Sequence, residues 1–251
     1  MNKLKFKISR EWTEYKLLMR NIPSISMTMF VLSVVLMNLL ANKELLNIGW
    51  LALDCGFCLS WLSFLSMDMI TRRFGAKASI EVSITAVVIN LMASLILFLL
   101  SLTPGNWGVF YDTEDAVVNS ALNSTIGSTW YVVLGSMTAF VISSIVNALL
   151  NEGIGKLCRS KSFGSFAVRS YVSTMIGQFV DNLIFASMVS YVFFGWSLVQ
   201  VITCSFAGAM MELISEIIFS PIGYKVCKKW EKEKIGEEYL VEENQVKGEI
   251  V

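Results

Sequence analysis

The sequence lacks histidine altogether and has few charged residues and few prolines. Without histidine the chain has no Ser-His-Asp or Cys-His nucleophile and lacks the commonest metal ligand. Charged residues make up 16% of the 251 residues, whereas a soluble domain carries about 25%. Three prolines are too few for Pro-rich or collagen-like segments. These absences argue against an ordinary soluble enzyme.

The cysteines do not form a disulfide framework. There are five, an odd number, and four of them lie in or beside apolar stretches. Cys55 and Cys58 form a CxxC pair, but no second pair and no histidine accompany it, so helix packing is favoured over a zinc site. We expect no metal and no cofactor.

Long hydrophobic runs dominate the chain, which is 55% hydrophobic with a mean hydropathy of +0.61. A helix that spans a membrane needs about 20 mostly apolar residues. Six segments meet this requirement: 24–41, 48–68, 80–102, 129–150, 169–193 and 196–221. We therefore predict an all-α polytopic integral membrane protein with six transmembrane helices, the last ending at Pro221.

Lysine and arginine are distributed unevenly between alternate loops. Of the 20 basic residues, 19 fall on one predicted side and only Lys43 falls on the other. The positive-inside rule places both termini in the cytoplasm, with the protein in the plasma or inner membrane. The predicted organisation is a cytoplasmic N-terminal arm (1–22), a six-helix transmembrane domain (23–224) and a charged cytoplasmic tail (225–251). Within the arm, residues 8–22 are expected to form a helix on the membrane surface.

A short sequence echo suggests an internal repeat. The first span ends N-L-L-A-N at 38–42, and the fourth ends N-A-L-L-N at 147–151. Three helices per half would give two halves of inverted topology, as in many secondary transporters. A 3+3 inverted repeat is therefore a hypothesis.

Ionisable side chains lie deep in the predicted spans, where each is costly. Asp54, Asp181, Glu212 and Glu216 have no deep basic residue to pair with. They are protonated, line a wet cavity or meet a substrate. The alternative is a structural role in hydrogen bonds between helices.

The polar residues of the spans form the predicted site. Asp54 and Asp68, fourteen residues apart in the second span, are expected on one helix face with Trp61 between them. The substrate-binding candidates are Asp181, Gln178, Asn182, Asp54, Trp61, Glu212, Asn147 and Phe185. The proton-coupling candidates are Asp54, Asp181, Glu212 and Glu216. Asp68, Arg72 and Arg73 are predicted to serve structure or gating, with an ion pair as the structural option.

Several motifs together resemble the vitamin-uptake-transporter-like family, whose members are queuosine-precursor transporters. DMITRRFG at 68–75 resembles its D-x-x-x-E/R-x-x-G signature, and NLLANK at 38–43 looks like its first helix exit. STMIGQFVDNLIF at 173–185 resembles its S-x-x-x-x-Q/N-x-x-D-x-x-x-F motif, and PIGY at 221–224 its closing motif.

The resemblance implies a membrane transporter, not an enzyme, that imports a 7-deazaguanine such as 7-cyano-7-deazaguanine or its aminomethyl relative. Two positions depart from the common pattern. Many members have Glu where this chain has Arg72, and many have Lys where it has Met211 and Glu212. An extra carboxylate there could favour the cationic aminomethyl compound.

Other functions stay open at this point. Since no GxxxxGK[ST] motif is present, the chain does not hydrolyse ATP itself, and a secondary transporter is favoured. The alternative is the substrate-binding membrane subunit of an energy-coupled vitamin importer, which would need partner ATPases. An intramembrane aspartyl protease is disfavoured because GxGD is missing. The expected partners are a modified purine base and the lipid bilayer, with no nucleic acid, and a homodimer is one option for assembly.

Overall fold

The computed structural model describes residues 2–108, 115–157 and 163–249. The helices of the first half are α1 (Asn2–Asn21), α2 (Ser24–Leu40), α3 (Phe57–Phe74) and α4 (Ala76–Ser101). Those that follow are α6 (Ala116–Gly127), α7 (Thr129–Leu157), α8 (Phe163–Phe185), a π-helical turn η1 (Ala186–Ser190), α9 (Tyr191–Phe193), α10 (Leu198–Lys232) and α11 (Glu237–Glu249). Two short strands, β1 (Glu44–Ile48) and β2 (Leu51–Asp54), pair as an antiparallel hairpin.

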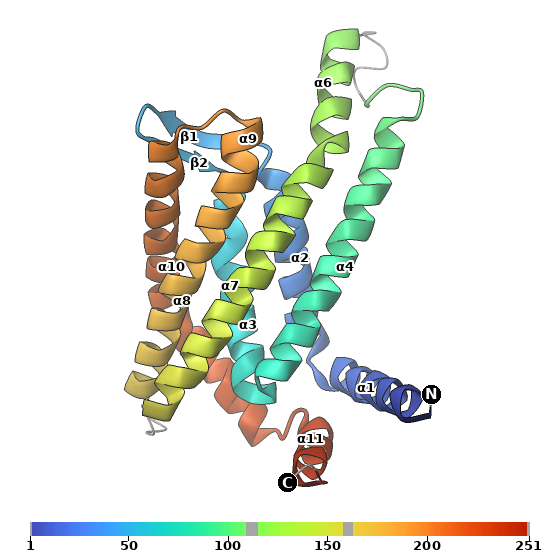
Figure 1. Ribbon diagram of the computed structural model, residues 1–251, viewed down its shortest axis with the longest axis vertical. Helices are drawn as coiled ribbons and strands as arrows, with labels where there is room; N and C mark the ends of the chain where they lie inside the picture. The colour runs from blue at the N-terminus through green and yellow to red at the C-terminus, as the bar shows by residue number, and fades with distance from the viewer. Residues whose placement is uncertain (1, 109–114, 158–162, 250–251) are drawn as a thin grey trace.

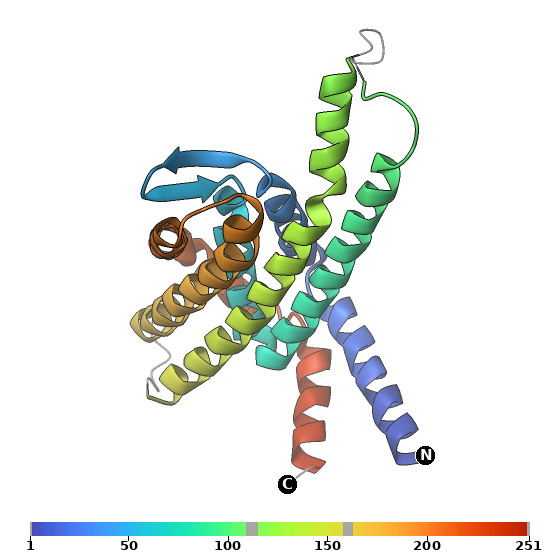
Figure 2. The same ribbon diagram turned by 45° about the horizontal axis from the view of Figure 1, so that its top comes forward.

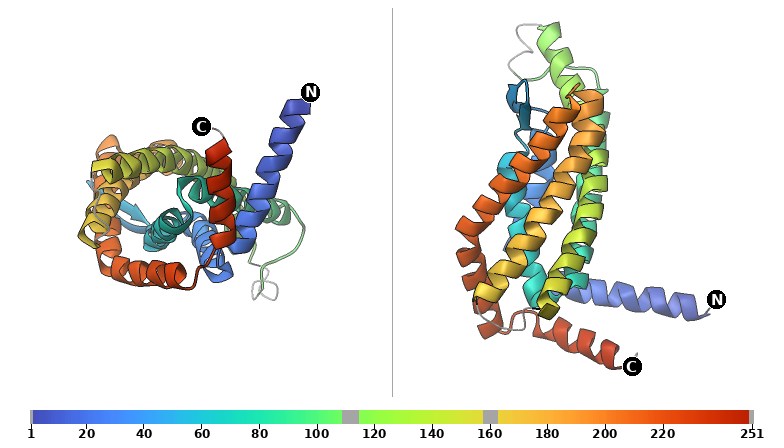
Figure 3. Two further views of the ribbon diagram at one scale, coloured as in Figure 1. Left: turned by 90° about the horizontal axis from the view of Figure 1, so that it is seen from below. Right: turned by 60° about the vertical axis from the view of Figure 1, so that its left-hand side comes forward.

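The long helices run alternately up and down one axis (Figure 1). The β1–β2 hairpin lies across one end of this bundle, which we call the hairpin end (Figure 2). Both chain termini lie at the opposite end, the terminal end, where α1 and α11 project away from the bundle (Figure 3). Termini at one end agree with an even number of passes along the axis.

The outward surface of the bundle is apolar. Only 28% of the most apolar stretch of α4 is buried, so its aliphatic side chains point away from the protein and require lipid around them. In the described ranges, four helical stretches are long and apolar enough to cross a membrane. The number rises to five if residues 10–21 of α1 and α2, which are bent by 101° relative to each other, are counted as one span. The chain is therefore a mainly α-helical, multi-pass membrane protein. Because α3 does not meet the same criteria, six spans remain a prediction, as does the inverted repeat.

The predicted second span, 48–68, is wrong at both ends. Residues 44–54 form the hairpin, with Gly49 and Trp50 at its tip, and α3 begins only at Phe57 and continues to Phe74. A short apolar run is compatible with a strand or a helix, and here the chain turns twice within it. Asp54 and Asp68 therefore do not share a helix face.

The sixth helix does not end at Pro221. It runs on to Lys232, so residues 225–232 continue α10, and residues 237–249 of the tail form α11. Proline removes the hydrogen bond to the carbonyl of Ile217, but the Ser220 hydroxyl donates to that oxygen at 3.5 Å. A neighbouring hydroxyl thus replaces the missing N–H, a common way for membrane helices to tolerate proline.

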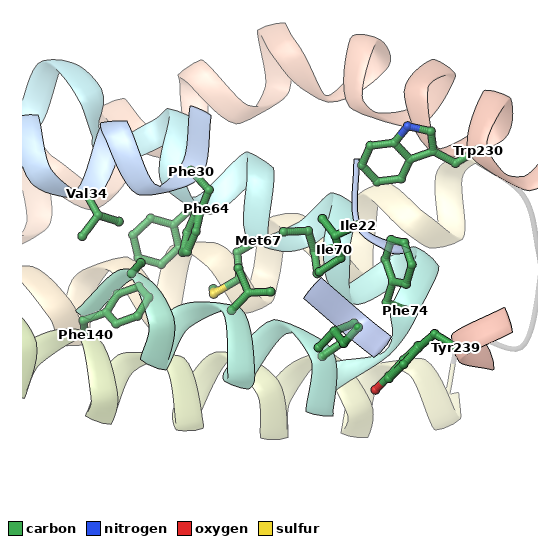
Figure 4. Close-up of a cluster of buried hydrophobic side chains, with 14 residues drawn as sticks. Ile22, Phe30, Val34, Phe64, Met67, Ile70, Phe74, Phe140, Trp230 and Tyr239 are labelled. Carbon is green, nitrogen blue, oxygen red and sulfur yellow. The ribbon is translucent and has the colours of Figure 1, made fainter. Parts of the chain in front are cut away.

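Most of the buried apolar side chains gather toward the terminal end (Figure 4). Phe30, Phe64 and Ile70 join α2 to α3, while Trp230 and Tyr239 bring in α10 and α11. This cluster packs the helices together beside the polar residues of the bundle.

Helix α1 is fastened to the start of α4 by a buried carboxylate. Lys77 and Arg10 both donate to Glu14, the latter at 3.2 Å. Burial raises the pKa of Glu14, but the hydrogen bonds and charges of Lys77 and Arg10 outweigh it and hold the pKa below its ordinary value of 4.5. Arg20 also reaches Glu238 of α11 at 3.2 Å. Residues 8–22, expected as a surface helix, thus form the greater part of α1.

Candidate functional site

A cavity opens toward the hairpin end, between α2, α3, α8 and α10. We call it the hairpin-end cavity. Its lining residues are Met37, Asn38, Ala41, Leu53, Asp54, Gly56, Phe57, Ser60, Ser136, Asp181, Asn182, Phe185, Ala186, Ser190, Trp196, Cys204, Gly208 and Glu212.

Asp181 enters the cavity from the last turns of α8. The Ser143 hydroxyl of α7 donates to its Oδ1 at 2.7 Å. One turn earlier, Gln178 is buried, and neither polar atom of its amide has a hydrogen-bond partner in the described part of the chain. The polar face that the sequence predicted on this helix therefore points into the bundle, away from lipid.

Glu212 enters the same cavity from α10 and is only 2% exposed. The Asn182 amide donates to its Oε2 at 3.4 Å, and the Ser60 hydroxyl lies within hydrogen-bonding reach. Gly208, one turn before Glu212, makes this contact possible. A Cβ at Gly208 would lie 2.6 Å from the Asn182 nitrogen, closer than real Cβ atoms approach.

Asp54 closes the cavity from the hairpin. Its Oδ1 accepts the Gly56 backbone N–H at 2.8 Å, at the point where the chain enters α3. A carboxylate at a helix start is stabilised by free N–H groups and the helix dipole. Asp54 therefore has a structural role in addition to lining the cavity.

The hairpin that carries Asp54 is fixed to the start of α10. Trp196 Nε1 donates to Glu44 at 2.8 Å, and Gln200 Nε2 donates to Asn47 Oδ1 at 3.0 Å. Ser197 and Gln200 also form a reciprocal capping box, which sets the first turn of α10. The hairpin and α10 thus hold the hairpin end of the cavity together.

The charge balance of the lining is one-sided. Of the residues that the structure describes, three carboxylates face the cavity and no Lys, Arg or His lines it. Among the described residues, no group of three His, Cys, Asp or Glu side chains could hold a metal ion. Buried carboxylates need compensation, so the site suits protons, a cation or a ligand rich in N–H donors. Phe57, Phe185 and Trp196 supply flat apolar walls.

A comparison with family models matches residues 54–226 to the family described as "Putative vitamin uptake transporter". The match covers more than half of the chain and includes Asp54, Asp181 and Glu212. The chain belongs to the vitamin uptake transporter family. Searches of curated proteins and of solved structures found no match.

Membership of the vitamin uptake transporter family makes this a membrane transporter and implies a non-enzymatic role. It also confirms the resemblance drawn from the sequence motifs. Three of the four motifs, at 68–75, 173–185 and 221–224, lie wholly inside the matched region.

The structure brings five of the eight predicted substrate-binding residues together. Those lining the hairpin-end cavity are Asp54, Asp181, Asn182, Phe185 and Glu212. Gln178 lies one turn below it, in the helix packing. Trp61 does not line the cavity and stacks on Phe219 of α10, with ring centroids 4.1 Å apart. Its position between Asp54 and Asp68 was inferred from a continuous helix that the hairpin interrupts.

The other predicted residues lie toward the terminal end. Asn147 and Asp68 line a second, smaller cavity, the terminal-end cavity. Arg72 sits over the Tyr224 ring and 3.9 Å from Glu231, while Arg73 Nε donates to the Ile235 carbonyl at 2.8 Å. These contacts fit the predicted structural role of the arginines.

Glu216, one turn beyond Glu212 on α10, is buried outside both linings. Glu81, near the start of α4, has Lys77 Nζ 3.8 Å from its carboxylate.

Trp196, Cys204, Ser60, Ser190 and Asn38 also line the hairpin-end cavity, although sequence reasoning did not select them as binding residues. Asn38 had a signal, since it begins the N-L-L-A-N echo. Trp196 had none, because it lies in the turn between α9 and α10 and reaches the cavity through tertiary packing.

Proposed function

We propose that the protein imports a 7-deazaguanine precursor of queuosine, as a secondary transporter in the cell membrane. The observation that supports this is the lining of the hairpin-end cavity, with three carboxylates, no basic side chain and three aromatic rings. Family membership supplies the transport function, and the cavity supplies the chemistry of the cargo.

A guanine-like edge matches this lining. It presents two adjacent N–H donors, which one carboxylate accepts in a bidentate arrangement. The amides of Asn182 and Asn38 would read the carbonyl of the base, and Phe185 or Trp196 would pack on its plane. Asp181 is the first candidate for the bidentate contact, because Ser143 orients its carboxylate from behind.

Orientation in the membrane follows from the basic residues. Arg10, Lys77 and Arg72 lie on elements at the terminal end, and the last turns of α10 add Lys228 and Lys229. We assign this end to the cytoplasm, which makes both termini cytoplasmic and directs the hairpin end outward. The precursor would then enter at the hairpin end.

The energy source follows from the same carboxylates. If import is concentrative, a proton carried by Asp54, Asp181, Glu212 or Glu216 would couple it, since desolvation favours the neutral form of a buried carboxyl group. Without coupling, the protein would equilibrate the precursor, and downstream enzymes would trap it. In liposomes with an imposed pH gradient, accumulation that a protonophore abolishes supports coupling, and simple equilibration refutes it.

The decisive test uses a bacterial strain that cannot make the precursor. Expression of this chain should restore queuosine in tRNA at limiting external 7-cyano- or 7-aminomethyl-7-deazaguanine. Asp181→Asn should abolish the rescue at equal expression, while Glu242→Gln, the same change of a carboxylate to an amide on exposed α11, should not. Absence of rescue by the wild type would refute the proposed cargo. ATPase subunits that co-purify with the protein would favour the energy-coupled importer instead.

A further inference from the structure

The terminal-end cavity holds the same pair of side chains as the hairpin-end cavity. Asp68 of α3 and Asn147 of α7 line it, just as Asp181 of α8 and Asn38 of α2 line the other. Asn38 lies on the first predicted span and Asn147 on the fourth, so each opens one half of the chain. Asp68 and Asp181 lie on the span that follows in each half. Each cavity therefore combines an Asn from one half with an Asp from the other. The two asparagines are also those that open the sequence echo at 38–42 and 147–151.

Two polar side-chain atoms of the terminal-end cavity have no hydrogen-bond partner in the described part of the chain. Asn147 is only 5% exposed, and its Oδ1 has no hydrogen-bond partner among the described residues. The Ser144 hydroxyl, on the same lining, is likewise buried without one in that part of the chain. A buried acceptor without a partner is costly, so such groups point to a bound polar molecule.

Further buried polar side chains lie on α7 and α8. On α7, Ser143 donates to Asp181 of the hairpin-end cavity, and Asn147, one turn further, lines the terminal-end cavity. On α8, Thr174 and Gln178 are each 1% exposed, and their side-chain polar atoms have no hydrogen-bond partner within the described ranges. Polar groups that face the interior of a membrane bundle in this way are typical of a transport path.

We propose that the terminal-end cavity is a second binding site for the transported ligand, occupied after the hairpin-end cavity on the way through the protein. This rests on the proposed function, since it takes the ligand to be a 7-deazaguanine with N–H donors and a carbonyl. Asp68 accepts the donor edge, and Asn147 with Ser79 and Ser83 completes the polar contacts. With one carboxylate in place of three, this site binds more weakly and favours release.

Two variants of purified full-length protein test the assignment. Asn147→Ala should lower uptake of 7-aminomethyl-7-deazaguanine into liposomes at least tenfold, while equilibrium binding at the intact hairpin-end cavity changes less than about threefold. Asn90→Ala is the matched control, because Asn90 is a buried asparagine of α4 that lines neither cavity. It should leave both measurements near wild type.

A labelling experiment gives a readout that a merely structural role would not change. Ser79→Cys, with the five native cysteines replaced by serine, places a thiol in the terminal-end cavity. The ligand should slow maleimide labelling of that thiol severalfold. No labelling at all, or labelling that the ligand does not slow, would overturn the second site.

The results also separate this proposal from the proposed function. Wild-type protein that neither binds nor carries the deazaguanine refutes both. Wild-type transport together with normal uptake by Asn147→Ala, or with equal loss of binding and uptake in that variant, refutes only the second site. Should Asn147→Ala fail to fold, the labelling experiment decides alone.

Discussion

The close approach of Asn182 to α10 makes Gly208 the position where the smallest change should have a large effect. Gly208→Ala would place a Cβ 2.6 Å from the Asn182 nitrogen and 3.2 Å from its Cγ. An ordinary contact begins at 3.4 Å, so the amide must move by about 0.8 Å. Its hydrogen bond to Glu212 is already long at 3.4 Å, and a shift of that size breaks it.

The expected magnitude follows from that single bond. A hydrogen bond to a charged group contributes about 1.5–3 kcal/mol. If the Asn182–Glu212 pair orients the ligand, its loss should weaken binding by about tenfold to a hundredfold. Overpacking costs about 1–3 kcal/mol, but alanine gains about 1 kcal/mol in helix propensity over glycine, so the fold should survive.

The assay compares uptake and thermal unfolding of Gly208→Ala and Gly153→Ala in the same membranes. Both changes add one methyl group within a long helix, but nothing lies within 4 Å of the position that a Cβ would take at Gly153. Only Gly208→Ala should raise the KM for the precursor. Wild-type KM in a well-folded Gly208→Ala protein would show that the Asn182–Glu212 contact has no part in binding.

Three further predictions concern the polar groups at the two ends. Ser143→Ala removes the hydroxyl that donates to Asp181. At about 1.5 kcal/mol for one hydrogen bond to a charged group, the KM should rise about tenfold. The same uptake as in a Ser94→Ala control would contradict this prediction. Because the charged residues of the described lining are all carboxylates, the hairpin-end cavity should favour the cationic aminomethyl compound over the neutral nitrile. Glu212→Gln should reduce that preference in competition uptake. Equal competition by both compounds in the wild type would count against this prediction. Glu14 has a lowered pKa, so its contribution to stability is present above about pH 4.5 and is lost as pH falls through the folded-state pKa. Glu14→Gln should therefore lower the melting temperature at neutral pH and make it depend less on acid pH. Parallel curves of melting temperature against pH for the two proteins would refute this.

The sequence predicted the helices whose apolar runs are long and uninterrupted. The 24–41 span corresponds to α2 and the 80–102 span to α4, because no turn divides either run. It failed at residues 44–54, where a short apolar segment folds as a hairpin, and at Pro221, where the Ser220 hydroxyl sustains the helix. The hairpin is fixed by contacts with the start of α10, and the helix through Pro221 is supported by a side-chain hydroxyl. Neither follows from the hydrophobic pattern or from the presence of a proline.

The candidate site was predictable where chemistry alone identifies a residue. Asp181 and Glu212 stand out because a carboxylate in an apolar helix is costly. Trp196 and Ser60 do not stand out, since their place in the lining depends on how the hairpin and α10 pack. The division of the predicted residues between two cavities also required the fold, because Asp54 and Asp68 separate only once the hairpin is seen.

The central claim is that the carboxylates of the hairpin-end cavity bind a 7-deazaguanine. Equilibrium binding of 7-aminomethyl-7-deazaguanine to the purified protein, with Asp181→Asn and Glu242→Gln measured alongside, tests it most directly. The account predicts saturable binding to the wild type and to Glu242→Gln, and a loss of at least tenfold in affinity for Asp181→Asn. Equal affinity in all three proteins, or no binding to the wild type, would contradict it.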